Sequence, residues 1–175
     1  VALGMNACGK NDETTGNKTF NSYAMKSHEL VFAFTAPART EEGGFRRDVQ
    51  GNLELVEEDK EIEEEKRRAR QFVDKHGLAV KRVCLRVENC KEAFEVSTKN
   101  GAVAIHEPRT LKNRKDGREA TVAEVALYGD VELRFVEDTT THLDADETYR
   151  YLDYDAVEQN ENSENRNYGL KRLDH

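Results

Sequence analysis

Five histidines are the residues of this 175-residue chain best suited to metal binding or proton transfer. We expect ordinary surface roles for His28 in a predicted turn, for His76 just before a helix-ending glycine, and for His142 in a polar stretch. His106 ends a predicted strand, where a metal role has no second ligand at a useful spacing. His175 follows an aspartate where the visible sequence ends, and the local pattern leaves its role open.

Other residue patterns point away from familiar catalytic sites. Glu124 and Asp130 could form a pair of carboxylates, but a sheet face and a tight turn are their predicted places, which favours structural roles. The sequence contains no nucleophile elbow, phosphate loop, paired-cysteine site or zinc-protease helix. Cys8, Cys84 and Cys90 are odd in number and fit no zinc spacing, which favours reduced thiols and a cytoplasmic location.

The charge balance narrows the choice of partner. Charged residues make up 35% of the chain, against a usual share of about 25%, and the net charge is −8. An acidic chain lacks the surplus of Lys and Arg that phosphate contacts need, so we expect no nucleic-acid partner. No run of about 18 apolar residues occurs, so we also expect no membrane partner.

Residues 78–137 are predicted to form a βαβββ module. Alternating apolar residues predict a half-buried strand at 83–87. A helix is predicted to begin after Asn89, a typical cap residue, and to end at Asn100-Gly101. Three further strands are predicted at 102–106, 121–127 and 131–136.

Residues 1–38 read as a weaker copy of the same module, with strands predicted at 5–8, 19–25 and 30–34. Leu30, Phe32 and Phe34 take the places of Val131, Leu133 and Phe135, at an offset of roughly 100 residues. The copy lacks an opening strand and most of a helix, so we expect the first module to be incomplete and the chain to be cut at its N-terminus. An exposed edge and apolar face there would invite association.

The remaining segments are predicted to be connections. Residues 39–77 read as a charged loop followed by a linker helix, in which an acidic half precedes a basic half as the helix dipole favours. Residues 138–167 read as a polar linker. Residues 168–175 read as the first strand of a further domain, so we expect the chain to be a fragment at both ends.

Several strings resemble one known family, and they occur in that family's order. They are Ser27–Pro37, His76–Val80, Arg86–Cys90, Ala123–Val131 and Tyr168–His175. The first resembles the end of the first module in the 4-hydroxyphenylpyruvate dioxygenase family, the next three its second module, and the last the opening of its catalytic half. The resemblance implies an α+β fold of paired βαβββ modules, the vicinal oxygen chelate or glyoxalase-like fold.

The resemblance also implies a chemistry. Members of the family convert 4-hydroxyphenylpyruvate and dioxygen to homogentisate and carbon dioxide, in tyrosine and phenylalanine catabolism, with Fe(II) held by two His and one Glu. By position, His175 matches the first iron-binding His, whereas the other two ligands lie beyond this sequence. We therefore expect a non-catalytic N-terminal part, inactive alone, that packs against its own C-terminal catalytic domain, within a homo-oligomer.

Two alternatives stay open. One is 4-hydroxymandelate synthase, which shares the fold, the iron and the substrate, and whose distinguishing residues belong to the missing half. The other is a stand-alone relative of the fold that acts as a binding or structural module. The chain departs from the family pattern at His28, where Gly is common, in the high charge of residues 39–71, and around residues 152–154.

Overall fold

The computed structural model describes residues 4–38, 45–47, 53–55, 60–112, 117, 119–138, 154–157 and 168–172. The chain divides into two compact units. The first contains Val1–Lys75 together with Tyr154–His175, and the second contains His76–Asp153. No helix in the described part of the chain has the length and apolar character needed to cross a membrane.

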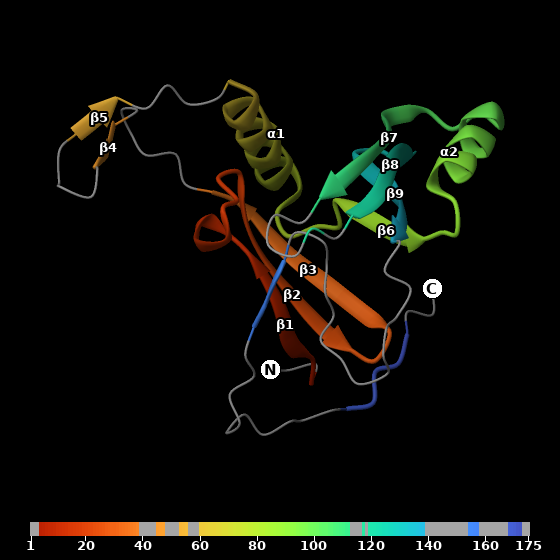
Figure 1. Ribbon diagram of the computed structural model, residues 1–175, viewed down its shortest axis with the longest axis horizontal. Coiled ribbons are helices and arrows are strands. Elements are labelled where there is room, and N and C mark those ends of the chain that lie inside the picture. Colours follow the sequence, from red (N-terminus) through yellow and green to blue (C-terminus); the bar gives the residue numbers. More distant parts are fainter. Residues whose placement is uncertain are drawn as a thin grey trace. The chain divides into compact units, whose positions relative to one another are not determined.

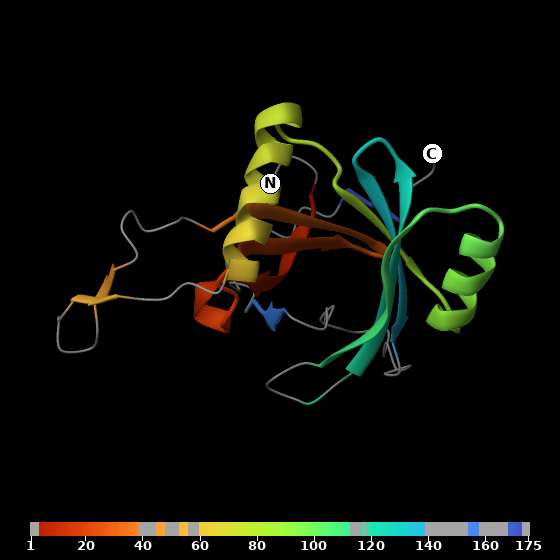
Figure 2. The same ribbon diagram turned by 90° about the horizontal axis from the view of Figure 1, so that it is seen from above.

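The second unit is one four-stranded sheet with a helix along one face, as Figure 2 shows. Its elements are β6 (Arg82–Arg86), α2 (Cys90–Lys99), β7 (Ala104–Lys112), β8 (Glu119–Tyr128) and β9 (Val131–Asp138). The strands lie in the order β6-β9-β8-β7. The pair β6–β9 is parallel and the other pairs are antiparallel. The predicted βαβββ order is therefore confirmed.

The predicted helix cap holds α2 in place. The side chain of Asn89 accepts a hydrogen bond from the Glu92 amide over 2.9 Å, which satisfies one of the first unpaired N–H groups of the helix. The helix ends at Asn100, and Gly101 follows with a φ of +100°. This φ explains why the residue is glycine, because residues with a Cβ rarely adopt it.

The core of the second unit lies between α2 and the sheet. Cys90 and Phe94 of the helix pack against Ala123 and Val125 of β8 and Phe135 of β9. These strand residues alternate with polar ones, so the opposite face of the sheet is left for charged side chains. That opposite face carries the candidate site.

Strand β7 is longer than the sequence predicts, because it continues through Pro108 to Lys112. The predicted strand ends at residue 106, just before Pro108, and a proline cannot donate to a strand ladder. β7 is an edge strand, and its register with β8 shifts between His106 and Arg109. A proline is tolerated at such an irregularity on an edge, so the predicted end at residue 106 is wrong.

The first unit contains another sheet, with the strand order β10-β1-β2-β3, whose strand pairs are antiparallel (Figure 1). Its strands are β1 (Asn6–Asn11), β2 (Phe20–Ser27), β3 (Leu30–Pro37) and β10 (Asp155–Ala156). A short 3-10 turn, η1 (Glu13–Thr15), lies between β1 and β2. The three N-terminal strands agree with the prediction. Strand β10 falls within the predicted polar linker and was not foreseen.

The two units repeat one arrangement. β1, β2 and β3 correspond to β7, β8 and β9 in strand order and pairing. The hairpin turn between β2 and β3 begins at His28, and the turn between β8 and β9 begins at Gly129. Both residues have a φ of +51°. His28 thus occupies a backbone conformation in which its counterpart is glycine.

The charged region at residues 39–77 differs partly from the prediction. Helix α1 spans Lys60–His76, and a two-stranded pair, β4 (Phe45–Arg47) with β5 (Leu53–Leu55), precedes it. Within α1, Glu64 pairs with Arg68 one helical turn later. Residues 168–172 show no strand, although one was predicted at 168–175, and the last three residues of that prediction lie outside the described part.

Candidate functional site

Glu124 is the central residue of the polar face of the second unit. Its neighbours Ala123 and Val125 face α2, and strand alternation turns Glu124 to the other side of the sheet. In the strand register, Glu124 lies opposite His106 on β7 and opposite Arg134 on β9. Three adjacent strands therefore place these side chains in one row.

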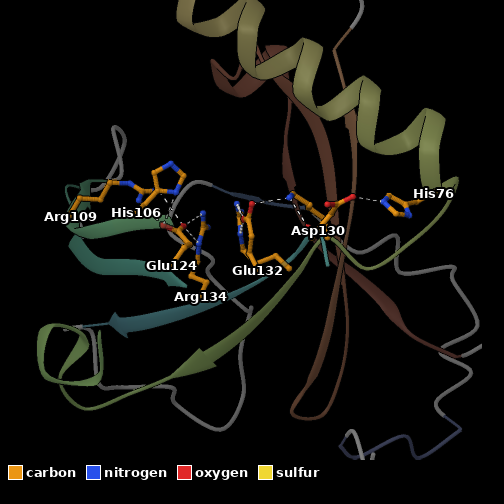
Figure 3. A network of polar contacts seen from close by, with 9 residues as sticks. His76, His106, Arg109, Glu124, Asp130, Glu132 and Arg134 are labelled. Atoms are coloured by element: carbon orange, nitrogen blue, oxygen red, sulfur yellow. Dashed lines mark hydrogen bonds and ion pairs between the residues drawn. The ribbon is translucent and has the colours of Figure 1, made fainter. Parts of the chain in front are cut away.

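Figure 3 shows His106, Arg109 and Arg134 converging on the carboxylate of Glu124. Arg109 donates from Nη1 to Oε2 over 2.7 Å and from Nη2 to Oε1 over 3.2 Å. Arg134 donates from Nε to Oε1 over 2.6 Å. His106 Nδ1 lies 3.4 Å from Oε2. The carboxylate is completely buried, so these groups replace the water that an ionised acid requires.

The arginines keep Glu124 ionised. Burial alone raises the pKa of a carboxylic acid, because the charged form loses its hydration. Here the hydrogen bond from Arg109 and the charges of Arg134 and Arg109 outweigh burial, and the pKa of Glu124 lies below its ordinary value of 4.5. A carboxylate with a low pKa whose oxygens accept from two guanidinium groups is a poor general base.

A second ion cluster lies on the same sheet. Glu132 of β9 accepts from Arg82 Nε over 2.9 Å and pairs with Lys81 over 2.8 Å. Burial alone would raise the pKa of Glu132. The hydrogen bonds and charges of Lys81 and Arg82 outweigh burial, so the pKa of Glu132 lies below its ordinary value. Lys81 also donates from Nζ to the Asp130 carbonyl over 2.9 Å, and the Asp130 carboxylate lies 2.8 Å from His76 Nε2. Glu124 thus contacts Arg109 and Arg134, whereas the carboxylate of Asp130 contacts His76.

This geometry supports a structural role for the cluster. The bidentate fork of Arg109 and the cross-strand contact of Arg134 tie β7, β8 and β9 to one register. The described residues contain no group of three or more His, Cys, Asp or Glu side chains that could hold a metal ion. They therefore do not themselves provide an iron site of two His and one Glu.

The remaining candidate residues separate into two groups. His28 lies in the β2–β3 turn, His76 at the end of α1, and His106 on β7 beside Glu124. His142 and His175 lie outside the described residues, so the metal role of His175 stays a prediction.

Sequence reasoning missed the two arginines around Glu124. Arg134 could not have been placed there from the sequence, because an ideal two-residue hairpin would put Phe135 opposite Glu124, and the register shift between Ala126 and Tyr128 brings Arg134 there instead. Arg109 could not be placed either, because the irregular register of β7 changes which of its residues face Glu124.

Solved structures with a similar fold include a triple mutant of 4-hydroxymandelate synthase from Streptomyces coelicolor. The match has a TM-score of 0.56 and 18% identity, and covers 78% of this chain and 32% of that one. A hypothetical protein from Bacillus halodurans matches with a TM-score of 0.50 and 15% identity, over 81% of each chain. These similarities show the fold, and they agree with the predicted vicinal oxygen chelate architecture.

No protein-family model matches the chain. Curated relatives named 4-hydroxyphenylpyruvate dioxygenase match 99% of it: the Arabidopsis thaliana protein at 33% identity over 177 residues, the Daucus carota protein at 34% over 176, and the Hordeum vulgare protein at 34% over 181. The chain spans 36% of the length of the first and 35% of the other two. By its sequence similarity to these relatives, the chain therefore belongs to the 4-hydroxyphenylpyruvate dioxygenase family.

Proposed function

We propose that this chain is the N-terminal part of an Fe(II)-dependent 4-hydroxyphenylpyruvate dioxygenase, which converts 4-hydroxyphenylpyruvate and dioxygen to homogentisate and carbon dioxide in tyrosine catabolism. The observation that carries the proposal is the match along 99% of the chain to relatives named for this activity. The match covers about a third of those relatives, which supports a partial chain rather than the whole enzyme.

The metal chemistry belongs to residues beyond those described. When bound, Fe(II) would offer open coordination positions at which the 2-oxo acid and dioxygen meet. His175 is the candidate for one ligand, and a second His and a Glu would have to come from the rest of the enzyme. A single imidazole cannot select Fe(II), so the chain by itself is inactive in this proposal.

The role proposed for this part is support of the catalytic domain. The clusters at Glu124 and Glu132 fix the sheet of the second unit through ion pairs, which leaves that unit as a rigid body for packing. In this proposal, residues 1–38 and 78–137 are the two modules of the N-terminal half. Residues 39–77 connect the two modules, and residues 138–167 connect the second module to the next domain. The whole enzyme is a homo-oligomer. Free thiols at all three cysteines support a cytoplasmic location.

The test compares this chain with the complete gene product. Each is incubated aerobically with Fe(II), ascorbate and 4-hydroxyphenylpyruvate, and homogentisate is measured by chromatography and mass spectrometry. The expected result is homogentisate from the complete protein and none from the 175-residue chain. In the complete protein, His175→Ala is expected to lower both bound iron and turnover, whereas the matched variant His106→Ala keeps the iron. Homogentisate from the 175-residue chain would overturn the proposal.

A second candidate, 4-hydroxymandelate synthase, is favoured by the fold similarity to that enzyme. The same incubation distinguishes it, because the product would be 4-hydroxymandelate.

A third candidate is a stand-alone binding or structural module. It is favoured by the Bacillus halodurans protein, because the matched fold covers 81% of that chain. The sequence after His175 decides this case: a stop codon favours the module, and a further His and Glu favour the enzyme. Iron measured in the complete gene product is an independent check.

A further inference from the structure

The described segment nearest the C-terminus packs on the first unit. Residues 168–172 belong to that compact unit, although they lie far from its strands in the sequence. The hydroxyl of Ser27 donates to the Leu170 carbonyl over 2.8 Å, and the Glu29 amide donates to the Lys171 carbonyl over 3.2 Å. Ser27 and Leu170 are 143 positions apart, so these contacts are tertiary and do not belong to a local turn.

Both donors come from the β2–β3 turn. Ser27 pairs with Leu30 at the end of the hairpin, so His28 and Glu29 form a two-residue turn. The amide of the second turn residue has no partner within such a turn, because the turn closes with the amide of the residue that follows. Ser27 is 6% exposed, so its hydroxyl depends on a protein acceptor rather than on water. The turn therefore presents two donors whose hydrogen bonds end on residues 168–172.

Residues 154–157 are fixed to the same unit. β10 pairs with β1, and the hydroxyl of Tyr154 donates to Ser22 Oγ over 2.8 Å. Tyr154 lies so close to Gly9 that a Cβ added there would come within 3.1 Å of the Tyr154 Cβ. In the described part of the chain, both stretches that follow the second unit thus contact the first unit, one on each side of residues 158–167.

Fixing Lys171 limits how far the residues after it can move. His175 follows Lys171 by four positions, which is a reach of at most about 14 Å for an extended chain. A metal ligand that must first be brought into place binds with an affinity reduced by the fraction of chains in the competent arrangement. Contacts that hold Lys171 raise this fraction for a ligand carried just after it.

We propose that Ser27 and the Glu29 amide position the segment that carries the iron ligand His175. They are positioning residues, because they act through the backbone carbonyls of Leu170 and Lys171 and not on iron or substrate. The inference rests on the proposed function for the identity of His175 as a ligand. It adds a task for the first unit, whose hairpin turn raises the affinity of the complete enzyme for its metal.

The first measurement tests the contact without metal. The complete gene product, freed of iron with a chelator, is digested briefly with trypsin, and cleavage after Lys171 and Arg172 is quantified by mass spectrometry. Cleavage of this kind follows the population of chains in which the segment has opened. Ser27→Ala removes one hydrogen bond, so this cleavage is expected to be about two- to tenfold faster than in the natural chain.

The second measurement is the affinity for Fe(II), titrated anaerobically into the same iron-free protein. Ser27→Ala is expected to raise the dissociation constant for Fe(II) by about two- to tenfold. Excess Fe(II) is expected to restore the natural turnover in Ser27→Ala, because the ligand itself is still present. Excess Fe(II) is not expected to restore turnover in His175→Ala.

Two further variants separate positioning from a general loss of stability. Ser27→Thr keeps the hydroxyl and is expected to retain the natural cleavage rate and Fe(II) affinity. Ser97→Ala removes a hydroxyl of the same kind, which donates to the Ala93 carbonyl over 2.6 Å within α2. This matched control is expected to leave both measurements unchanged.

The contrary results are distinguishable from one another. Cleavage of Ser27→Ala at the natural rate would overturn the proposal, because the turn would not hold the segment. Faster cleavage with unchanged Fe(II) affinity would also overturn it and would leave the proposed function standing. Equal effects of Ser27→Ala and Ser97→Ala would assign both to general destabilisation and contradict positioning. Iron fully retained by His175→Ala would contradict the proposed ligand itself, and the positioning proposal with it.

Discussion

Arg134 on β9 lies directly opposite Glu124 on β8, and its Nε donates to the buried carboxylate over 2.6 Å. The fork of Arg109 reaches the same carboxylate from β7. One acidic side chain therefore satisfies two cations on the two strands that flank it. A charge buried in this way stabilises the fold only as long as all its partners remain.

Replacing the shared acid is expected to be costly. Glu124→Gln leaves the guanidinium groups of Arg109 and Arg134 without a counter-charge, and it should lower the free energy of unfolding by about 3 kcal/mol. Urea unfolding followed by circular dichroism measures the change. The matched control is Glu119→Gln on the same strand, whose pair with Lys112 is exposed and should contribute less than about 1 kcal/mol. Equal effects of the two variants would contradict a special role for Glu124.

Acid should remove the contribution of Glu124. Its pKa is depressed in the folded chain, so between that pKa and the ordinary value of 4.5 the unfolded state binds more protons. The stabilisation is then complete above about pH 4.5 and is lost as the pH falls through the folded pKa. Unfolding measured from pH 7 to pH 3 should show the natural chain and Glu124→Gln converging below pH 4.5. A constant difference across that range would argue against the depressed pKa.

The β2–β3 turn should accept glycine. His28 has a φ of +51°, which costs energy for a residue with a Cβ, although histidine tolerates it better than most. His28→Gly removes this strain but adds chain entropy to the unfolded state, so we expect a net gain below about 1 kcal/mol. Glu29→Gly, at the next position of the turn, gains no such relief and should destabilise by about 0.5–1 kcal/mol. Thermal unfolding measures the change in stability of each variant. A change in the same direction for both variants would contradict the prediction.

The three thiols should react at different rates. Cys84 is exposed, whereas Cys8 and Cys90 are buried. Burial raises the pKa of both buried thiols, and the charges of Glu137 and Glu124 raise that of Cys90 further. We expect a thiol reagent to modify Cys84 rapidly in the native chain and all three cysteines in urea. Mass spectrometry of tryptic peptides measures the modification at each cysteine. Rapid native labelling at Cys90 would mean that α2 does not remain closed over the sheet.

Local patterns predicted much of the second unit. Alternation located β6 and β9, and the sequence Asn89 to Glu92 located the start of α2, because caps and alternation depend on neighbouring residues. The prediction failed where residues far away in the sequence determine whether a segment forms a strand. Pro108 remains in β7 because β7 is an edge strand, and β10 forms because residues 155–156 pair with β1.

The candidate site was harder to predict than the fold. Glu124 was recognised as a sheet-face carboxylate, but its partners come from two other strands, and the register of β8 with each of those strands is shifted. A single sequence gives no direct signal for contacts of that kind. His175 and His142 were singled out by type and position, and they lie outside the described residues.

The parallel pairing of β6 with β9 has a kinetic consequence. β8 and β9 are joined by a two-residue turn, whereas Arg82 and Glu132, which pair across β6 and β9, are 50 positions apart. Closing a longer loop costs more chain entropy, so the β8–β9 hairpin should form early and β6 should join last. By the same reasoning β6 is the strand that opens first when the unit begins to unfold, and the lifetime of the folded unit depends on how firmly Arg82 and Lys81 hold Glu132.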